Sequence, residues 1–113
     1  MIYSTRNLIQ WADQNNIPSS VFPRDEKRLL AMDTLILTNL NLTDIPKEIC
    51  LLKNLDSLYL SYNELASLPK EIYQLEKLET LHLQGNKLTQ LDNDILSLQS
   101  LHTIIAFDNV ISY

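Results

Sequence analysis

Two serines, a histidine and an aspartate in the middle of the chain are the residue types of a hydrolytic triad. They are Ser57, Ser61, His82 and Asp56. In such a triad the imidazole takes the proton of the serine hydroxyl, and the carboxylate orients the imidazole. Catalysis also requires a pocket and hydrogen-bond donors preorganised for the oxyanion. Whether these side chains can react therefore depends on the elements that position them.

Metal binding has little support in the pattern of potential ligands. His82 and His102 could lie on neighbouring elements, with Glu79 and Asp56 nearby. The chain lacks the closely clustered ligand spacing that is typical of a zinc site. We therefore expect both histidines to be surface residues, and we expect neither a metal nor a cofactor.

The chain holds one glycine, Gly85, and one cysteine, Cys50. A single glycine excludes a glycine-rich phosphate loop, and Tyr62 at the equivalent repeat position indicates that a positive φ is not demanded there. Cys50 cannot form an intrachain disulfide, which fits a reducing compartment, and it reads as a half-buried small hydrophobic residue. The first residues lack the continuous apolar segment of a secretory signal. We expect a cytoplasmic protein, with a translocated effector that has no cleavable signal as the alternative.

A repeat of 23 residues organises most of the chain. Full copies begin at Met32, Leu55 and Leu78, and a truncated fourth copy begins at Leu101. A fixed period of this length, with leucines at matching offsets, is typical of a solenoid that places one supersecondary unit in each repeat. We therefore divide the single domain into a segment over 1–31 and repeats over 32–113.

The spacing Leu-x-x-Leu-x-Leu within each copy alternates as a strand does, so that equivalent strands would stack as a parallel sheet. The side chains expected to point inward are Leu35, Leu37, Leu58, Leu60, Leu81, Leu83, Ile104 and Ala106. Three residues after each strand the sequence has Leu40, Asn63, Asn86 or Asn109. A buried asparagine can donate to and accept from turn peptide groups, and leucine cannot. We predict a ladder of the three asparagines, and a first turn that is satisfied differently.

Helical segments are expected at the start of the chain and on the far side of each coil. The pattern predicts helices over 4–16, with Ser4 as N-cap, and over 23–31, with Pro23 at the first helical position. These helices would cap the first coil, whose apolar edge would otherwise face water. Pro46 and Pro69 are expected to open helical turns opposite the sheet, and Asp92 replaces proline in the third coil.

The repeated pattern LxxLxLxxNxLxxLPxxIxxLxx over residues 32–113 resembles the leucine-rich repeat family, in the short form of its intracellular and bacterial members. The resemblance implies an α/β fold: a curved solenoid with a parallel sheet on its concave face and short helical or irregular turns on its convex face. It also implies a non-catalytic module that binds a protein or peptide on the concave face.

Side chains that point outward from the expected strands form a candidate binding surface. An open sheet offers no pocket and nothing to hold the imidazole, so we set the triad aside and expect no enzyme. Aromatic and aliphatic residues on this face are typical of binding anchors, although they are also good strand formers. The predicted partner-binding residues are Ile36, Tyr59, Ser61, Tyr62, His82, Gln84, Ile105 and Phe107.

Charge argues against a nucleic-acid partner. The net charge is −5, and residues 32–113 carry five basic and eleven acidic groups. Such a surface repels phosphate backbones and leaves a basic protein partner open. The apolar runs are only a few residues long, so we expect no membrane span.

The last coil has no recognisable cap and ends in apolar residues. Leu101, Ile104, Ala106 and Ile111 would face no further coil, and a free strand edge is a template for pairing. Two arrangements remain open: Tyr113 folds over the edge, or the edge meets a second copy in a two-fold dimer. We favour the dimer, so that self-association through this edge is the alternative function.

Overall fold

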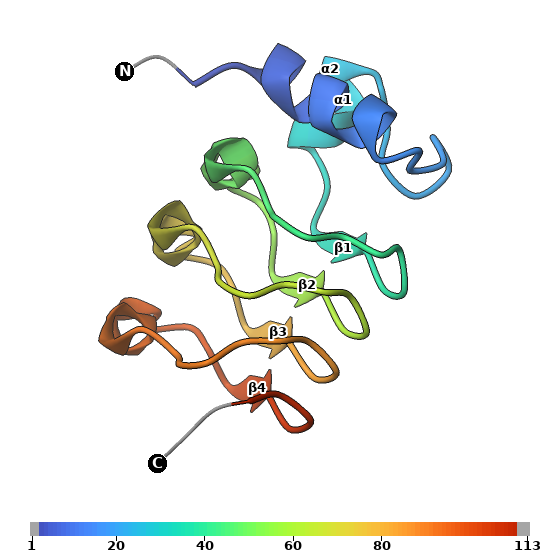
Figure 1. The fold of residues 1–113 in the computed structure, drawn as a ribbon. Helices are drawn as coiled ribbons and strands as arrows, with labels where there is room; N and C mark the ends of the chain where they lie inside the picture. The colour runs from blue at the N-terminus through green and yellow to red at the C-terminus, as the bar shows by residue number, and fades with distance from the viewer. Residues whose placement is uncertain (1–2, 111–113) are drawn as a thin grey trace.

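The computed structural model describes residues 3–110 as two short α-helices followed by four similar coils (Figure 1). Each coil begins with a three-residue strand, and the first three coils return through a five-residue 3-10 helix on the opposite side. The elements in chain order are α1 Thr5–Gln14, α2 Glu26–Leu30, β1 Thr34–Ile36, η1 Lys47–Leu51, β2 Ser57–Tyr59, η2 Lys70–Gln74, β3 Thr80–His82, η3 Asn93–Ser97 and β4 Thr103–Ile105. None of the helices in this part of the chain is both long and apolar enough to cross a membrane.

The strands form one parallel sheet in the order β1-β2-β3-β4. Leu58 pairs with Leu35 on one side and with Leu81 on the other, so neighbouring strands are offset by one repeat. The same register continues from Leu81 to Ile104. The predicted α/β repeat solenoid is thereby confirmed, with the sheet on one side and the short helices on the other.

The inward leucines form the core that the repeat predicts. The side chains of the six predicted leucines of the first three strands are fully buried: Leu35, Leu37, Leu58, Leu60, Leu81 and Leu83. Ile104 in β4 is 39% exposed instead, because β4 is the edge strand of the sheet and no further coil within residues 3–110 packs against it. Each fully buried leucine contributes about 2 kcal/mol of hydrophobic stabilisation, so the core weakens toward β4.

Each 3-10 helix begins at the residue that the sequence marked. Pro46 and Pro69 stand at the N-caps of η1 and η2, where their φ of −71° and −66° suits extended backbone. Asp92 takes the same place before η3, with φ −67°. The Asp92 carboxylate accepts a hydrogen bond from the backbone N–H of Asp94 at 2.9 Å. The aspartate therefore replaces a rigid ring by a side-chain cap.

The two N-terminal helices are shorter than predicted. Helix α1 begins after Ser4, whose hydroxyl accepts from the N–H of Arg6 as expected, but it ends at Gln14 because Asn16 takes a left-handed φ of 56°. Helix α2 begins at Glu26 and not at Pro23, since the Asp25 carboxylate caps it by accepting from the N–H of Arg28. The Asp25 carboxylate thereby satisfies one of the free N–H groups of the first helical turn, as an N-cap residue does.

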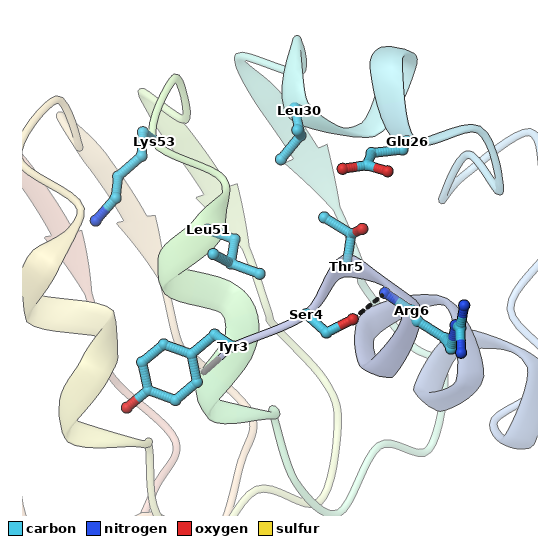
Figure 2. Close-up of a pocket in the computed structure, with 8 residues that line it drawn as sticks. All are labelled: Tyr3, Ser4, Thr5, Arg6, Glu26, Leu30, Leu51 and Lys53. Carbon is cyan, nitrogen blue, oxygen red and sulfur yellow. Dashed lines mark hydrogen bonds between the residues drawn. The ribbon is translucent and has the colours of Figure 1, made fainter. Parts of the chain in front are cut away.

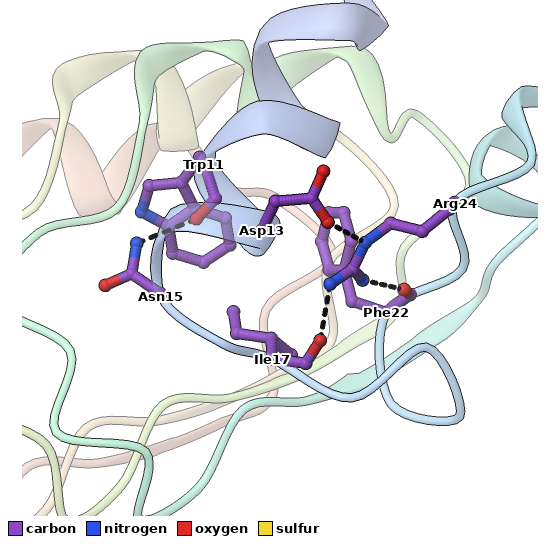
Figure 3. Close-up of polar contacts among 6 residues, drawn as sticks. All are labelled: Trp11, Asp13, Asn15, Ile17, Phe22 and Arg24. Carbon is purple, nitrogen blue, oxygen red and sulfur yellow. Dashed lines mark hydrogen bonds and ion pairs between the residues drawn. The ribbon is translucent and has the colours of Figure 1, made fainter.

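A small polar cluster links the end of α1 to the segment that connects it to α2 (Figure 3). The Arg24 guanidinium donates to the Asp13 carboxylate at 2.8 Å and to the backbone carbonyls of Phe22 and Ile17. Beneath it the rings of Trp11 and Phe22 meet edge to face, with centroids 5.8 Å apart. The arginine thus satisfies carbonyls that no helix or strand uses, while the aromatic pair fills the space below.

Helix α1 packs against η1 of the first coil (Figure 1). The Asn7 amide donates to the buried carboxylate of Glu48 at 2.9 Å, and the Tyr3 hydroxyl donates to Glu71 at 3.3 Å. Leu8, Trp11 and Phe22 belong to the same buried cluster as the repeat leucines. The N-terminal helices therefore cover the first coil and share its core.

Candidate binding face

The outward side chains of β1–β4 and of the turn that follows each strand form the open sheet face. Equivalent positions lie side by side on neighbouring strands, because the register shifts by one whole repeat. The central column consists of Ile36, Tyr59, His82 and Ile105. The column beyond it consists of Thr38, Ser61, Gln84 and Phe107.

Most of the predicted binding residues reach the surface of this face. Phe107 is 64% exposed, Ile36 56% and Tyr62 50%. The others with accessible side chains are half-buried: Tyr59, His82, Gln84 and Ile105. Three large, exposed side chains of apolar or aromatic type on one sheet face are more than solubility requires, and they are spread over the first, second and fourth coils.

Ser61 does not reach the surface, and its inclusion among the exposed binding residues is wrong. Its side chain is buried, with 3% of its surface exposed. Its hydroxyl lies 3.5 Å from that of Thr38 on the neighbouring strand. A short side chain between the longer Thr38 and Gln84 is covered by its neighbours, so burial here depends on adjoining coils.

The predicted asparagine ladder is present behind the turns. The Asn63 amide nitrogen donates to the carbonyls of Leu37 and Leu60, while its oxygen accepts from the N–H of Leu42 at 3.0 Å. Asn86 repeats these contacts one coil later, with Leu60, Leu83 and Leu65 as partners. Asn109 does so with Leu83, Ala106 and Leu88. Each asparagine therefore joins its own coil to the preceding one.

This pattern explains why the first coil has Leu40 in place of an asparagine. Every asparagine of the ladder serves the turn of the coil before it, and the first coil is preceded by helices and not by another coil. The backbone N–H of Leu40 donates to the Asn63 side chain at 2.9 Å, as does that of Leu42. The first turn is thus satisfied by the second coil, and Leu40 packs partly against the core.

The residue just before each ladder position has a left-handed backbone. The φ values are 60° at Asn39, 58° at Tyr62, 73° at Gly85 and 58° at Asp108. The expectation that this position does not demand a positive φ is therefore wrong. The reversal of the chain after each strand imposes the conformation, and Tyr62 adopts it at a cost of about 1–2 kcal/mol.

A neighbouring side chain also leaves no room for a Cβ atom at Gly85. A Cβ atom placed on Gly85 would lie 2.3 Å from Cδ1 and 2.8 Å from Cε1 of Tyr62. Since Tyr62 occupies the equivalent position one coil earlier, its ring lies over the glycine backbone. The single glycine of the chain thus allows a tyrosine ring to lie on the open sheet face.

We expect Gly85→Ala to lower the free energy of unfolding by about 2 kcal/mol, because it combines an unfavourable left-handed alanine with displacement of the Tyr62 ring. In a Tyr62→Ala background the same substitution should cost about 1 kcal/mol, since only the backbone term remains. Urea denaturation of the four proteins of this double-mutant cycle measures the difference. Equal costs in both backgrounds would show that the ring does not rest on the glycine.

The triad residues are near one another but are not arranged for catalysis. The Ser57 hydroxyl donates to the Asp56 carboxylate at 2.8 Å, so the aspartate holds the serine and not the histidine. The His82 ring meets the ring of Tyr59 edge to face, with centroids 4.6 Å apart. Ser61 is buried. A triad needs the imidazole between the hydroxyl and the carboxylate, and this face has a different order of contacts.

Residues 3–110 contain no group of three or more histidine, cysteine, aspartate or glutamate side chains placed to hold a metal ion. Cys50 is buried more completely than predicted, with 2% of its surface exposed. Burial raises the pKa of the Cys50 thiol, which keeps it protonated and a poor nucleophile.

A further column borders the open sheet face and lies outside the surface that the sequence predicts. It consists of Asp33, Asp56, Glu79 and His102, each one residue before a strand. The backbone N–H of Asp56 donates to the carbonyl of Asp33 at 2.8 Å, and the N–H of Glu79 donates to that of Asp56 at 2.7 Å. Sequence reasoning could have found this column, because Asp33, Asp56 and Glu79 are spaced by one repeat of 23 residues.

An open hollow of about 610 Å³ lies at the N-terminal end of the described residues, between the start of α1, α2 and η1 (Figure 2). The Ser4 hydroxyl in this hollow is already engaged as the cap of α1. Its lining residues are Tyr3, Ser4, Thr5, Arg6, Glu26, Leu30, Leu51 and Lys53.

Comparison with known proteins gives one family and a related solved structure. A leucine rich repeat family model matches residues 31–88. The structure of a leucine-rich repeat protein from Leptospira interrogans is similar, with a TM-score of 0.63 and 29% sequence identity over 96% of this chain. This chain spans 36% of the length of that protein. No curated protein matches the chain. With the repeat register, the asparagine ladder and more than half of the sequence matched, the chain belongs to the leucine-rich repeat family.

Proposed function

We propose that this chain is a non-catalytic module that binds a protein or peptide on its open sheet face. The observation that carries the proposal is the set of exposed side chains on that face, led by Phe107, Ile36 and Tyr62. Leucine-rich repeats act in general as protein-interaction modules, which supports the assignment.

The anchors are held ready for a partner by the fold beneath them. Tyr59 and His82 are fixed by their mutual ring contact, and Tyr62 by its place over Gly85. Rigid aromatic side chains lose little conformational entropy on binding, so they serve well as anchors. The face is open and continuous across four strands, which suits an extended segment or a flat protein surface.

We expect Tyr59→Ala and Phe107→Ala each to weaken partner binding by more than about 1 kcal/mol while the fold stays intact. The partner is first captured from extracts of the source cell with the wild-type chain and identified by mass spectrometry. Its affinity for each variant is then measured by titration calorimetry.

Leu96→Ala is the matched control, because Leu96 is 84% exposed on η3, opposite the sheet. It removes a comparable apolar side chain from a different surface and should leave the affinity unchanged. An equal loss for Leu96→Ala and Phe107→Ala would count against the open sheet face.

Self-association through the last described coil is the second candidate function. Ile104 is exposed there, and this coil and the region of η3 together line a hollow of about 430 Å³. Apolar side chains line most of this hollow, among them Leu91, Ile95, Leu98 and Leu101. The expected cover by Tyr113, and the role of Ile111, lie outside the described residues.

Light scattering coupled to size exclusion separates the two candidates. A dimer mass at tens of micromolar that reverts to a monomer mass in Ile104→Lys would support self-association through this coil. A monomer mass for the wild type at the same concentration removes that candidate and leaves the first untouched.

A further inference from the structure

We propose that the open sheet face binds a positively charged, extended segment of a partner protein, in which lysine or arginine side chains flank apolar ones. The inference rests on the proposed function and adds the chemical class of the partner. It is carried by the separation of charge in this fold and by the place of the carboxylates beside the apolar anchors.

Charged residues are sorted between the open sheet face and the rest of the chain. The strands, with the residues just before and after them, cover 33–39, 56–62, 79–85 and 102–108. These segments contain four acidic residues and neither lysine nor arginine. All nine basic residues lie elsewhere: Arg6, Arg24, Lys27, Arg28, Lys47, Lys53, Lys70, Lys77 and Lys87.

Three of the four carboxylates stand one residue before adjacent strands. Asp33, Asp56 and Glu79 are linked through their backbones, so neighbouring members are about 5 Å apart along the solenoid. This spacing of the backbones is shorter than the screening length of about 8 Å at physiological salt, so a cationic side chain at this border is attracted by more than one carboxylate. Elsewhere in residues 3–110, Arg24 pairs with Asp13 and Lys87 pairs with Glu64. A cationic segment laid along this border would meet the three carboxylates in turn.

The position of one carboxylate is set by a side chain of the face itself. Ser57 lies on the open sheet face, and its hydroxyl donates to Asp56 at 2.8 Å. The carboxylate column therefore borders the face and does not turn away from it. Ile36 lies three residues after Asp33 in the first coil and is 56% exposed. The two residues are therefore about 10 Å apart along the extended backbone. A lysine stem can span much of this distance while an adjacent apolar side chain rests on Ile36.

The far border of the face has the same sign. Asp108 is exposed in the turn after β4. A segment that crosses the apolar centre from the carboxylate column toward the fourth coil thus meets a further carboxylate, which favours a cationic partner and disfavours an acidic one.

Three synthetic peptides test the inference by ¹⁵N-detected NMR titration of the whole chain at low and moderate salt. One alternates lysine with leucine and tyrosine, the second has glutamate in place of lysine, and the third has serine. We expect the lysine peptide to shift the amide signals of β1–β3, and its affinity to fall as salt is raised. The glutamate peptide should bind at least tenfold more weakly.

Two variants with the same change of net charge locate the effect. Asp33→Asn combined with Glu79→Gln should weaken the lysine peptide about fivefold, as expected for the loss of two exposed ion pairs. Asp44→Asn combined with Glu76→Gln removes two exposed carboxylates outside the face and should change the affinity less than twofold. Asp56 is left intact because it holds Ser57.

Equal weakening by the two double variants would overturn the inference, since the attraction would then come from net charge alone. Shifts of the lysine peptide confined to residues outside the strands, or the absence of any shift, would also overturn it. If the serine peptide binds the same strands as tightly as the lysine peptide, charge recognition fails while the proposed function stands. A different result would contradict the proposed function: the Phe107→Ala variant would capture the cellular partner as well as the wild type does.

Discussion

Replacing Asn86 with leucine is expected to lower the free energy of unfolding by about 3 kcal/mol. The Asn86 side chain is buried, with 7% of its surface exposed, and it joins two coils through the carbonyls of Leu60 and Leu83 and the N–H of Leu65. Leucine has a similar size but leaves these groups without partners, and each buried unsatisfied group costs about 1–3 kcal/mol. Urea denaturation followed by circular dichroism measures the loss.

Two matched variants make the test specific for the ladder. Asn109→Leu should cost less, because Asn109 is only half-buried and water can reach the groups that it leaves. Asn93→Leu makes the same chemical change at an exposed position of η3 and should stay within about 0.5 kcal/mol of the wild type. If Asn86→Leu were as mild as Asn93→Leu, the ladder would not be a source of stability.

Replacing Phe22 with alanine is expected to have the largest effect, about 4 kcal/mol. Phe22 is fully buried and meets Trp11 edge to face, so truncation leaves a cavity beneath both N-terminal helices. Phe107→Ala is the control, because the same truncation at a side chain that is 64% exposed removes little packing. Its effect on stability should stay within about 0.5 kcal/mol.

The same experiment tests whether residues 1–31 form one domain with the repeats. Trp11 is the only tryptophan, so its fluorescence reports on the N-terminal segment, while circular dichroism reports on the whole chain. We expect the two signals to change together in urea, because Phe22 and the repeat leucines belong to one buried cluster. Separate transitions, with Phe22→Ala shifting only the fluorescence, would show that the segment unfolds by itself.

The repeat made the main features of the fold readable from the sequence. Leu35, Leu58 and Leu81 stand at one register, and their burial follows from strand alternation alone. Asn63 and Asn86 were recognisable because a polar residue at a regular core position must bind peptide groups. The prolines that open η1 and η2 were likewise visible, since their effects act within a few residues, whereas the capping role of Asp92 was not predicted.

Most of the outward surface could be read in the same way, but its details could not. Alternation places Tyr59, His82 and Phe107 outward, and the carboxylates before the first three strands recur with the same period. Ser61 has the same alternation and is nevertheless buried, because the side chains on neighbouring strands are longer than its own. Alternation predicts the face of the sheet to which a side chain points, but it does not predict whether neighbouring side chains cover it.

The sequence by itself therefore determined the coil, its register and the ladder, since each depends on interactions repeated at a short, constant spacing. Only the tertiary structure decided that Tyr62 and Gly85 share a left-handed backbone and that the ring of one covers the other. The same holds for Arg24, whose guanidinium joins Asp13 to the carbonyls of Ile17 and Phe22. These contacts depend on how segments distant in the sequence pack together. Such contacts do not repeat from coil to coil, so they produce no periodic pattern in the sequence.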